Sequence, residues 1–223
     1  MKGKLIVIEG LDGSGKATQA KRLAAALQQL GKRVREISFP NYDSDSSALV
    51  KMYLSGVFGT QPGDVNAFAA SSFYAVDRYA GMKQDWGSFY DAGGILIADR
   101  YTTSNAVHQC CKLPKAQWDD YLDWLFDYEY RLLGLPAPEL VVYLRLGIET
   151  SQKLMSERYH GDEKKKDIHE SNMSYLEQAH FAADYCAGKY DWKTVECAAT
   201  GCLRSIEEIG TDVWNLVSHV IEL

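Results

Sequence analysis

Short runs of apolar residues alternate along this chain with longer segments in which apolar residues recur every three or four positions. The runs are typical of strands buried in a parallel sheet, and the periodic segments are typical of amphipathic helices. The sequence predicts strands at residues 5–8, 34–38, 95–98, 140–146 and 193–197. It predicts helices at residues 19–30, 46–58, 64–86, 115–133, 149–158, 171–187 and 206–220, with Asp64 as the N-cap of the third. Strands that alternate with helices predict an α/β fold, with one parallel sheet covered by helices on both faces.

Composition and charge are those of one globular domain. The chain has 223 residues, 46% of them apolar and 24% charged, and contains no internal repeat and no linker long enough to divide it. Its net charge of −6 argues against a nucleic-acid-binding surface. No apolar run approaches the length of a membrane span, and residues 1–4 lead into a strand rather than a signal peptide. The five cysteines form no C-x-x-C pair, so we expect reduced thiols in a cytoplasmic protein.

The segment with the clearest chemistry follows the first strand and opens the first helix. It consists of Gly10, Leu11, Asp12, Gly13, Ser14, Gly15, Lys16, Ala17 and Thr18. The glycines let backbone amides face inward, and the helix behind them adds unpaired N–H groups and the positive end of its dipole. Lys16 is then placed to reach the outer phosphates of a nucleotide. We predict a phosphate-binding loop; the alternative is a glycine turn that binds no ligand.

One position of this loop departs from the usual pattern G-x-x-x-x-G-K-[ST]. Ala17 stands where Ser or Thr normally helps to hold Mg²⁺, and alanine has no hydroxyl. Thr18 has the hydroxyl, but a neighbouring helix position faces another direction. The departure therefore affects metal handling more than phosphate binding.

The ends of the second and third strands carry further candidates. Phe39 and Tyr42 flank a stiff proline turn, which is either an apolar plug or a wall of a substrate pocket. Asp99 and Arg100 follow the third strand, at the edge where ligands collect in open α/β sheets. Asp99 is placed to order Mg²⁺ or its waters, and Arg100 to span donor and acceptor phosphates. The competing interpretation of this pair is a structural salt bridge.

Two helical faces complete the candidate pocket. Tyr74 and Arg78 are four residues apart, so they share one face and could offer a ring and a cation to one ligand. The alternative interpretation is that the tyrosine packs in the core and the arginine lies at the surface, because such pairs have the same spacing. Asn105, His108 and Gln109 share a face after the third strand and could bind a base edge or a sugar. No second imidazole or carboxylate lies at ligand spacing from His108, which favours a hydrogen-bonding role over metal binding.

Two other segments have open interpretations. Residues 159–170 are polar, broken by glycine and dense in both charge signs. They form either a solvated loop or a mobile lid that brings Arg158 and nearby lysines over a nucleotide. The aromatic-rich segment at residues 115–133 indicates core packing or a subunit interface.

The chain resembles thymidylate kinases along nearly its full length. The resemblance is carried by residues 9–16, 39–40, 73–78, 99–101 and 104–105. It implies a P-loop NTPase three-layer fold in one domain over residues 1–223, with five parallel strands and a lid at about residues 156–170. It also implies Mg²⁺-dependent transfer of the ATP γ-phosphate to dTMP in nucleotide biosynthesis, and a homodimer without nucleic-acid or membrane partners.

The resemblance assigns roles to the donor side of the site. Residues 10–18 would cradle the ATP phosphates with Lys16 on the outer ones, and Asp12 would face the acceptor's sugar and help the metal. Because Gly13 stands where some relatives have arginine, the lid would supply the catalytic cation through Arg158, as in the bacterial branch. Without a hydroxyl at Ala17, Mg²⁺ would be held through phosphate oxygens and waters on Asp99 and Asp12.

On the acceptor side, Arg78 and Arg100 would hold the dTMP phosphate. Tyr74 would stack on thymine where the family usually has Phe, and Asn105 would hydrogen-bond the base. His108 and Gln109 lie where the family closes around base and deoxyribose, with Phe39 and Tyr42 as further walls. Tyr74 and Ala17 keep two alternatives open: a kinase for another deoxynucleotide or deoxynucleoside, and a non-catalytic nucleotide-binding module.

Overall fold

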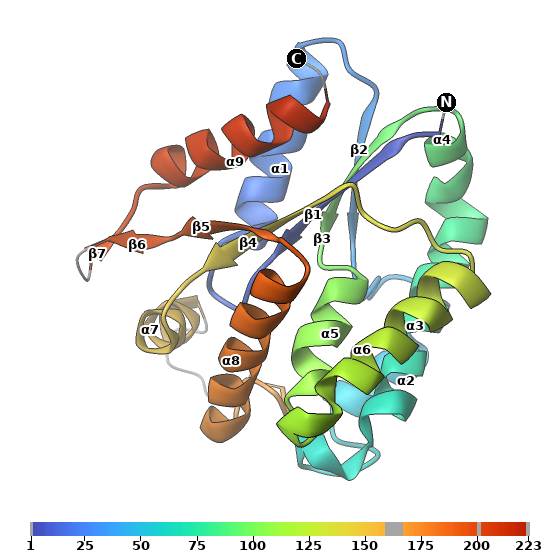
Figure 1. Ribbon diagram of the computed structural model, residues 1–223, viewed down its shortest axis with the longest axis vertical. Helices are drawn as coiled ribbons and strands as arrows, with labels where there is room; N and C mark the ends of the chain where they lie inside the picture. The colour runs from blue at the N-terminus through green and yellow to red at the C-terminus, as the bar shows by residue number, and fades with distance from the viewer. Residues whose placement is uncertain (1, 159–166, 200–201, 222–223) are drawn as a thin grey trace.

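A single parallel sheet forms the centre of the computed structural model, which describes residues 2–158, 167–199 and 202–221 (Figure 1). Its strands are β1 (Lys4–Glu9), β2 (Val34–Ser38), β3 (Ile95–Asp99), β4 (Leu140–Arg145) and β5 (Lys193–Glu196), in the order β2-β3-β1-β4-β5. Every neighbouring pair is parallel. Two short strands, β6 (Ala198–Ala199) and β7 (Cys202–Leu203), form a separate antiparallel pair. The predicted five-stranded parallel sheet is confirmed over the described residues.

The helices connect and cover these strands. They are α1 (Lys16–Gln29), α2 (Ala48–Leu54), α3 (Ala67–Gly81), α4 (Gly87–Asp91), α5 (Thr102–Cys110), α6 (Trp118–Phe126), α7 (Ile148–Arg158), α8 (Met173–Lys189) and α9 (Ile206–Val220). Single 3₁₀ turns precede α2, α3 and α6, at Asp45–Ser47, Pro62–Asp64 and Lys115–Gln117. Segments of π-helix follow α3 and α6, at Met82–Trp86 and Asp127–Leu132.

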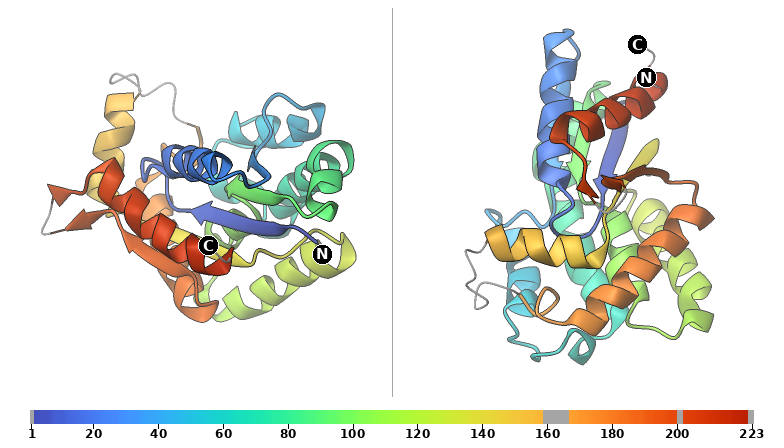
Figure 2. Two further views of the ribbon diagram at one scale, coloured as in Figure 1. Left: turned by 90° about the horizontal axis from the view of Figure 1, so that it is seen from above. Right: turned by 90° about the vertical axis from the view of Figure 1, so that its left-hand side faces the viewer.

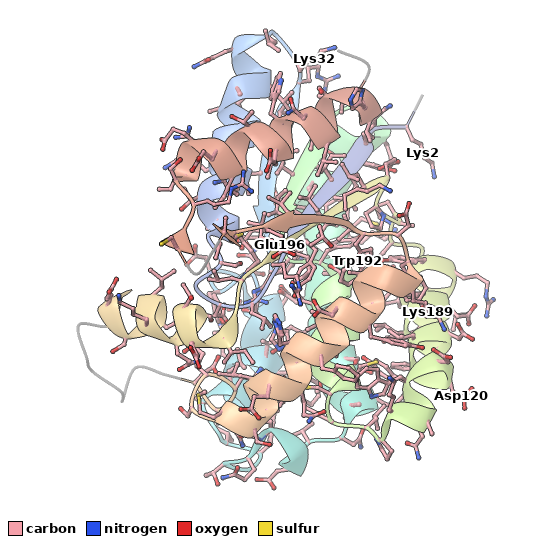
Figure 3. All side chains as sticks on the ribbon, turned by 60° about the vertical axis from the view of Figure 1, so that its left-hand side comes forward. Lys2, Lys32, Asp120, Lys189, Trp192 and Glu196 are labelled. Carbon is pink, nitrogen blue, oxygen red and sulfur yellow. The ribbon has the colours of Figure 1, made fainter. Side chains whose placement is uncertain are left out.

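Two hydrophobic cores lie on the two faces of the sheet, because successive strand residues point to opposite sides. Leu5 and Val7 of β1 belong to the core shared with α3, α5, α6 and α8. Ile6 and Ile8 belong to the core under α1 and α9. Figure 2 shows α1 and α9 together on one side of the sheet, and Figure 3 shows charged side chains such as Lys2, Asp120 and Lys189 at the periphery. Burial on both faces explains why the strands are continuous apolar runs, and the three-layer α/β fold is confirmed.

Several predicted helix boundaries are wrong. The helix predicted from residue 64 begins at Ala67, where the Asn66 side chain accepts a hydrogen bond from the backbone N–H of Ala69. Asp64 instead closes the preceding turn by accepting from the N–H of Gln61 at 3.0 Å. The helix predicted at residues 46–58 is confined to α2, because Gly56 takes a positive φ of 80°. The segment at residues 115–133 is divided among a turn, α6 and a π-helix.

The topology brings the candidate segments to one edge. The carboxyl ends of β1, β2 and β3 lie side by side, since Ile8 and Ser38 both pair in register with Asp99. The loop after β1, the turn after β2 and Arg100 after β3 therefore meet, although about ninety residues separate the first from the last. In the described part of the chain, no helix has the length and apolar character to cross a membrane.

Candidate active site

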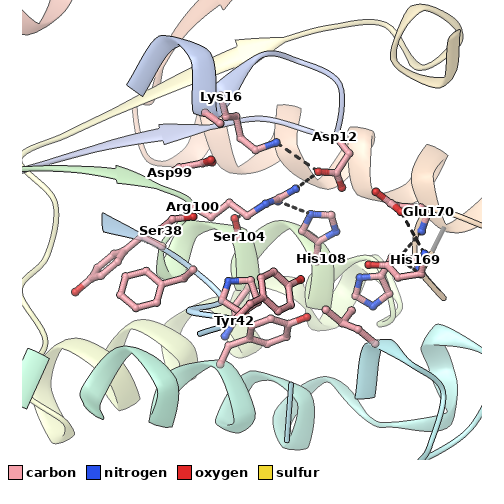
Figure 4. Close-up of a pocket in the computed structure, with 18 of the residues that line it drawn as sticks. Asp12, Lys16, Ser38, Tyr42, Asp99, Arg100, Ser104, His108, His169 and Glu170 are labelled. Carbon is pink, nitrogen blue, oxygen red and sulfur yellow. Dashed lines mark hydrogen bonds and ion pairs between the residues drawn. The ribbon is translucent and has the colours of Figure 1, made fainter. Parts of the chain in front are cut away.

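A cavity of about 830 Å³ opens at this edge of the sheet (Figure 4). It is lined by the loop after β1, the turn after β2, α3, the end of β3, α5 and the segment at residues 167–170. Most predicted site residues line it: Asp12, Gly13, Gly15, Lys16, Ala17, Thr18, Phe39, Tyr42, Tyr74, Arg78, Asp99, Arg100, Asn105, His108 and Gln109. Gly10, Leu11 and Ser14 of the predicted loop are buried outside this lining. The side chain of Arg158 and residues 159–166 lie outside the described residues.

The loop after β1 has the conformation of an anion cradle. Gly13 has a φ of 81°, and a Cβ there would lie 2.9 Å from the carbonyl oxygen of Ser151, so both backbone angle and space require glycine. Helix α1 starts at Lys16 with no side chain capping its first turn, so its N-terminal amides are available to a ligand. The Lys16 ammonium donates to the Leu11 carbonyl at 2.9 Å and lies 3.7 Å from Asp12 Oδ1.

Arg100 links the loop after β1 to helix α5. Its backbone is left-handed, with a φ of 67°, a conformation that is uncommon for a residue with a side chain and that accumulates at functional sites. Its guanidinium donates to Asp12, and Nη1 lies 3.2 Å from His108 Nε2 (Figure 4). Burial raises the pKa of the Asp12 carboxyl, but the charges of Arg100 and Lys16 outweigh burial and hold that pKa below its usual value. Burial and the Arg100 charge lower the pKa of Lys16.

His108 is a buried, neutral partner of Arg100. Burial, reinforced by the Arg100 charge, lowers the pKa of His108 to about 3. Because Nε2 accepts from Arg100, the ring proton is on Nδ1, which lies 3.3 Å from the Tyr175 hydroxyl. That hydroxyl donates to the His108 carbonyl oxygen at 2.8 Å. Both ring nitrogens thus contact side chains of the protein itself, Arg100 and Tyr175.

The segment at residues 167–170 closes one side of the cavity. Asp167 Oδ1 accepts from the backbone N–H groups of His169 and Glu170, each at 2.8 Å. The His169 ring packs on Tyr175 at 4.6 Å, and its Nε2 lies 2.7 Å from the Tyr53 hydroxyl. Burial raises the pKa of Asp167 to about 6, and neighbouring carboxylates add to the shift. The sequence predicted this segment as part of the lid but did not identify Asp167, His169 and Glu170 as residues that line the cavity.

At the far end of the cavity, Arg78 is buried and ion-paired. It is 1% exposed, and its Nε and Nη2 donate to the two carboxylate oxygens of Glu129 at 2.7 and 2.5 Å. Burial lowers the pKa of Arg78, but the charge and hydrogen bonds of Glu129 outweigh burial and raise it. That Arg78 holds an acceptor phosphate stays a prediction, because Glu129 already balances its charge. The signal for Glu129 in the sequence is its spacing, because it follows Tyr121 and Leu125 at intervals of four residues and so continues their helical face.

Polar atoms without partners mark other parts of the cavity. Gln109 Oε1 and Asp99 Oδ1 are buried and form no hydrogen bond within the described residues. Phe39 is buried against Tyr101 with ring centroids 6.0 Å apart, whereas Tyr42 is 55% exposed at the mouth. Phe39 therefore acts both as a plug at the end of β2 and as a wall of the cavity.

The residues present fit Mg²⁺ only as an ion held largely by a bound nucleotide. Asp99 Oδ1 is a carboxylate oxygen with no competing partner, and hard cations prefer oxygen ligands. The Asp12 carboxylate is engaged by Arg100 and Lys16, and Ala17 contributes only a methyl group. Across residues 2–158, 167–199 and 202–221, no group of three acidic, histidine or cysteine side chains could hold a metal. Phosphate oxygens and waters would have to supply the other ligands.

Comparisons with known proteins find related sequences and a similar fold. A sequence profile described as thymidylate kinase matches residues 8–196. The thymidylate kinase of Mycobacterium tuberculosis is 32% identical over 146 residues, which cover 65% of this chain and 67% of that protein. The thymidylate kinase of Danio rerio is 26% identical over 226 residues, covering 100% of this chain and 93% of the relative. The solved structure of Candida albicans thymidylate kinase superposes with a TM-score of 0.71 at 22% identity, over 98% of this chain and 92% of that one, which shows the shared fold.

Proposed function

The chain belongs to the thymidylate kinase family, and from that membership we propose that it transfers the γ-phosphoryl group of ATP to dTMP, forming dTDP and ADP for nucleotide biosynthesis. The observation that carries the proposal is the cavity at the edge of the sheet, where Arg100 and Asp12 join the glycine-rich loop to the part lined by Tyr74 and Asn105. The bond between the γ-phosphorus and the β-phosphate oxygen breaks, and a bond to a dTMP phosphate oxygen forms. Such a transfer needs mainly positioning and charge neutralisation.

The donor phosphates are held by residues 10–18. Free amides at the start of α1 supply hydrogen bonds and the positive helix end, and Lys16 supplies a charge from inside the cradle. The Leu11 carbonyl and Asp12 hold the Lys16 ammonium beside the loop. Ala17 and Thr18 line the same cavity.

The acceptor lies between Arg100 and Tyr74. Arg100, oriented by Asp12 and His108, binds the dTMP phosphate and bridges it to the donor. Asp12 also faces the sugar. Tyr74 stacks on thymine and Asn105 hydrogen-bonds the base, while Arg78 remains proposed as a second cation at the acceptor. Gln109, His108, Phe39 and Tyr42 complete the walls of this end.

Mg²⁺ bound with ATP would supply neutralisation of the charge on the phosphate oxygens. Asp99 would hold it through water, because Asp99 Oδ1 is buried and has no partner within the described residues. Asp12, already paired with Arg100 and Lys16, would contribute only through water. The chain itself provides the rigid loop, the cations and the exclusion of water.

The remaining features of the proposal concern the whole chain. Residues 1–223 form one catalytic domain with a lid at about residues 156–170, from which Arg158 supplies a catalytic cation. Two copies associate through exposed apolar residues of α2 and α3, among them Leu49, Met52, Phe68 and Val76. The five cysteines are free thiols, which supports a cytoplasmic location.

The test is ADP formation by the purified protein with Mg²⁺-ATP and, in parallel, dTMP, dUMP, dCMP, dGMP or thymidine. We expect turnover with dTMP well above the others. The variant Lys16→Met removes the charge proposed to act on the donor phosphates, so its kcat should fall at least a hundredfold while the fold is kept. Preference for another acceptor would refute the assignment of dTMP as the substrate. ATP binding without turnover on any acceptor would refute the proposal that the chain is an active kinase.

A further inference from the structure

We propose that Glu129 is a positioning residue that sets the hydrogen-bonding polarity of the acceptor end of the cavity by orienting Arg78 and Asn105. The role rests on the proposed function, since it concerns the same acceptor. Glu129 is 0% exposed, and it is not among the described residues that line the cavity, whereas Arg78 and Asn105 are. It therefore acts through these two side chains and not by touching the ligand.

Four donors from two helices converge on this carboxylate. Oε2 accepts from Arg78 Nε and from Thr102 Oγ1, each at 2.7 Å. Oε1 accepts from Arg78 Nη2 at 2.5 Å and from Asn105 Nδ2 at 3.4 Å. Arg78 lies on α3, and Thr102 and Asn105 lie on α5, so Glu129 holds the two helices that form this end of the cavity.

The helical spacing of α6 and the π-helix after it places Glu129 in the core. Trp118, Tyr121, Leu122 and Leu125 form the buried stripe of α6, and Glu129 continues the stripe into the π-helix Asp127–Leu132. Segments of π-helix are rare and occur frequently at functional sites. An apolar side chain at this position would serve packing at least as well, because a buried ion pair is often no more stabilising than an apolar pair of similar volume.

The contacts of Glu129 decide which atoms remain for a ligand. Asn105 Nδ2 donates to the Ser71 carbonyl oxygen at 3.2 Å and to Glu129, so both of its hydrogens are used. The amide is thereby oriented with Oδ1 as the group left for the acceptor, and an oxygen only accepts hydrogen bonds. Arg78 keeps Nη1, whose only hydrogen-bond contact within the described residues is one of 3.5 Å with the Tyr101 carbonyl oxygen.

This polarity selects among pyrimidines. A ring N–H, as in thymine and uracil, can donate to Asn105 Oδ1. Cytosine has an unprotonated nitrogen at that ring position, which would face another acceptor. Because a buried acceptor without a donor is costly, the arrangement favours the imide bases.

The experiment compares Glu129→Gln with Asp127→Asn, an exposed acid on the same π-helix that pairs only with Arg131 among the described residues. Steady-state rates are measured with dTMP, dCMP and ATP varied in turn, together with the thermal midpoint. Glutamine presents one amide nitrogen to donors that need an acceptor. We expect Glu129→Gln to raise KM for dTMP at least tenfold and to reduce the dTMP-over-dCMP preference at least tenfold. KM for ATP should stay within twofold, and Asp127→Asn should match wild type.

A purely structural role predicts a different result. Lower kcat in proportion to the folded fraction, with KM for dTMP and the dTMP-over-dCMP preference unchanged, would overturn the proposal. If Glu129→Gln does not fold, Glu129→Asp keeps the charge and withdraws it by one methylene. We then expect at least a threefold higher KM for dTMP, and wild-type KM and preference in that variant would overturn the proposal. Wild-type protein that does not use dTMP would refute the proposed function and, with it, this role.

Discussion

Arg100→Lys isolates the contribution of the guanidinium fork from that of its charge. Arg100 donates to Asp12 and to His108 Nε2 at 3.2 Å, and it still has N–H groups to offer a phosphate. Lysine keeps the positive charge but concentrates its donors on one atom, which cannot span the carboxylate, the imidazole and a phosphate together.

The expected loss follows from the hydrogen bonds that lysine cannot make. A hydrogen bond to a charged group contributes about 1.5–3 kcal/mol, so losing one or two of them costs about 3 kcal/mol in the transition state. That cost corresponds to a fall of about 150-fold in kcat/KM for dTMP. The free energy of unfolding should change by no more than about 1 kcal/mol, because the pair with Asp12 is partly exposed and the charge is kept.

The assay is coupled ADP release with dTMP varied at saturating Mg²⁺-ATP, with urea unfolding in parallel. Arg145→Lys is the matched control, because Arg145 forms a two-pronged pair with Asp184 outside the cavity. The control should keep wild-type kinetics. If Arg100→Lys retains kcat/KM for dTMP within threefold of wild type, Arg100 does not clamp the acceptor phosphate and the reasoning is wrong.

Three further predictions concern the metal, the pH dependence and the oligomer. Ala17→Ser restores a hydroxyl on an exposed first turn and should lower the Mg²⁺ concentration for half-maximal activity by at least threefold; an unchanged Mg²⁺ titration would contradict the metal argument. Burial lowers the pKa of His108 to about 3 and that of His169 well below its usual value, so below about pH 6.5 the unfolded chain binds protons that the folded chain does not, and stability falls on acidification by up to about 2.7 kcal/mol per pH unit. Asp167, whose pKa burial raises to about 6, binds up to one more proton in the folded chain than in the unfolded chain, and so offsets part of this pH dependence. The double variant His108→Gln/His169→Gln should reduce the loss of unfolding free energy between pH 7 and pH 5, measured by urea titration. An unaltered pH dependence would refute the assignment of these two histidines as its source. Val76→Glu places a charge on a 45% exposed apolar residue of α3 and should convert a homodimer to monomer in light scattering, whereas a dimer of unchanged affinity would exclude this surface.

The fold was predictable because its determinants are local and periodic. The runs in β1 and β4 are apolar at successive positions, which happens when both faces of a strand are buried, and the two hydrophobic cores show that burial. Helix ends were less predictable. Asp64 and Asn66 are both good N-caps, and the choice between them depends on the tertiary position of the turn Pro62–Asp64, which spacing along the chain does not encode.

Among the candidate site residues, those close together in the sequence could be predicted, and those paired only by long-range packing could not. Residues 10–18 could be predicted as a phosphate loop because such a loop is one continuous segment with a fixed spacing, and Asp99 and Arg100 could be predicted beside it because strand ends in a parallel sheet share an edge. Glu129 was not found, since its partner Arg78 lies 51 residues away and only packing brings the two together. The same holds for His169, whose contact with Tyr53 spans 116 residues.

The most direct test of the account follows the transferred group itself. Purified protein is incubated with ATP labelled in the γ-phosphate, Mg²⁺ and dTMP, and the labelled products are separated by chromatography. We expect the label to appear in dTDP, in a one-to-one ratio with ADP, and chelation of Mg²⁺ to abolish the transfer. Label released only as inorganic phosphate, or retained in ATP by a protein that binds both nucleotides, would show that the chain does not phosphorylate dTMP.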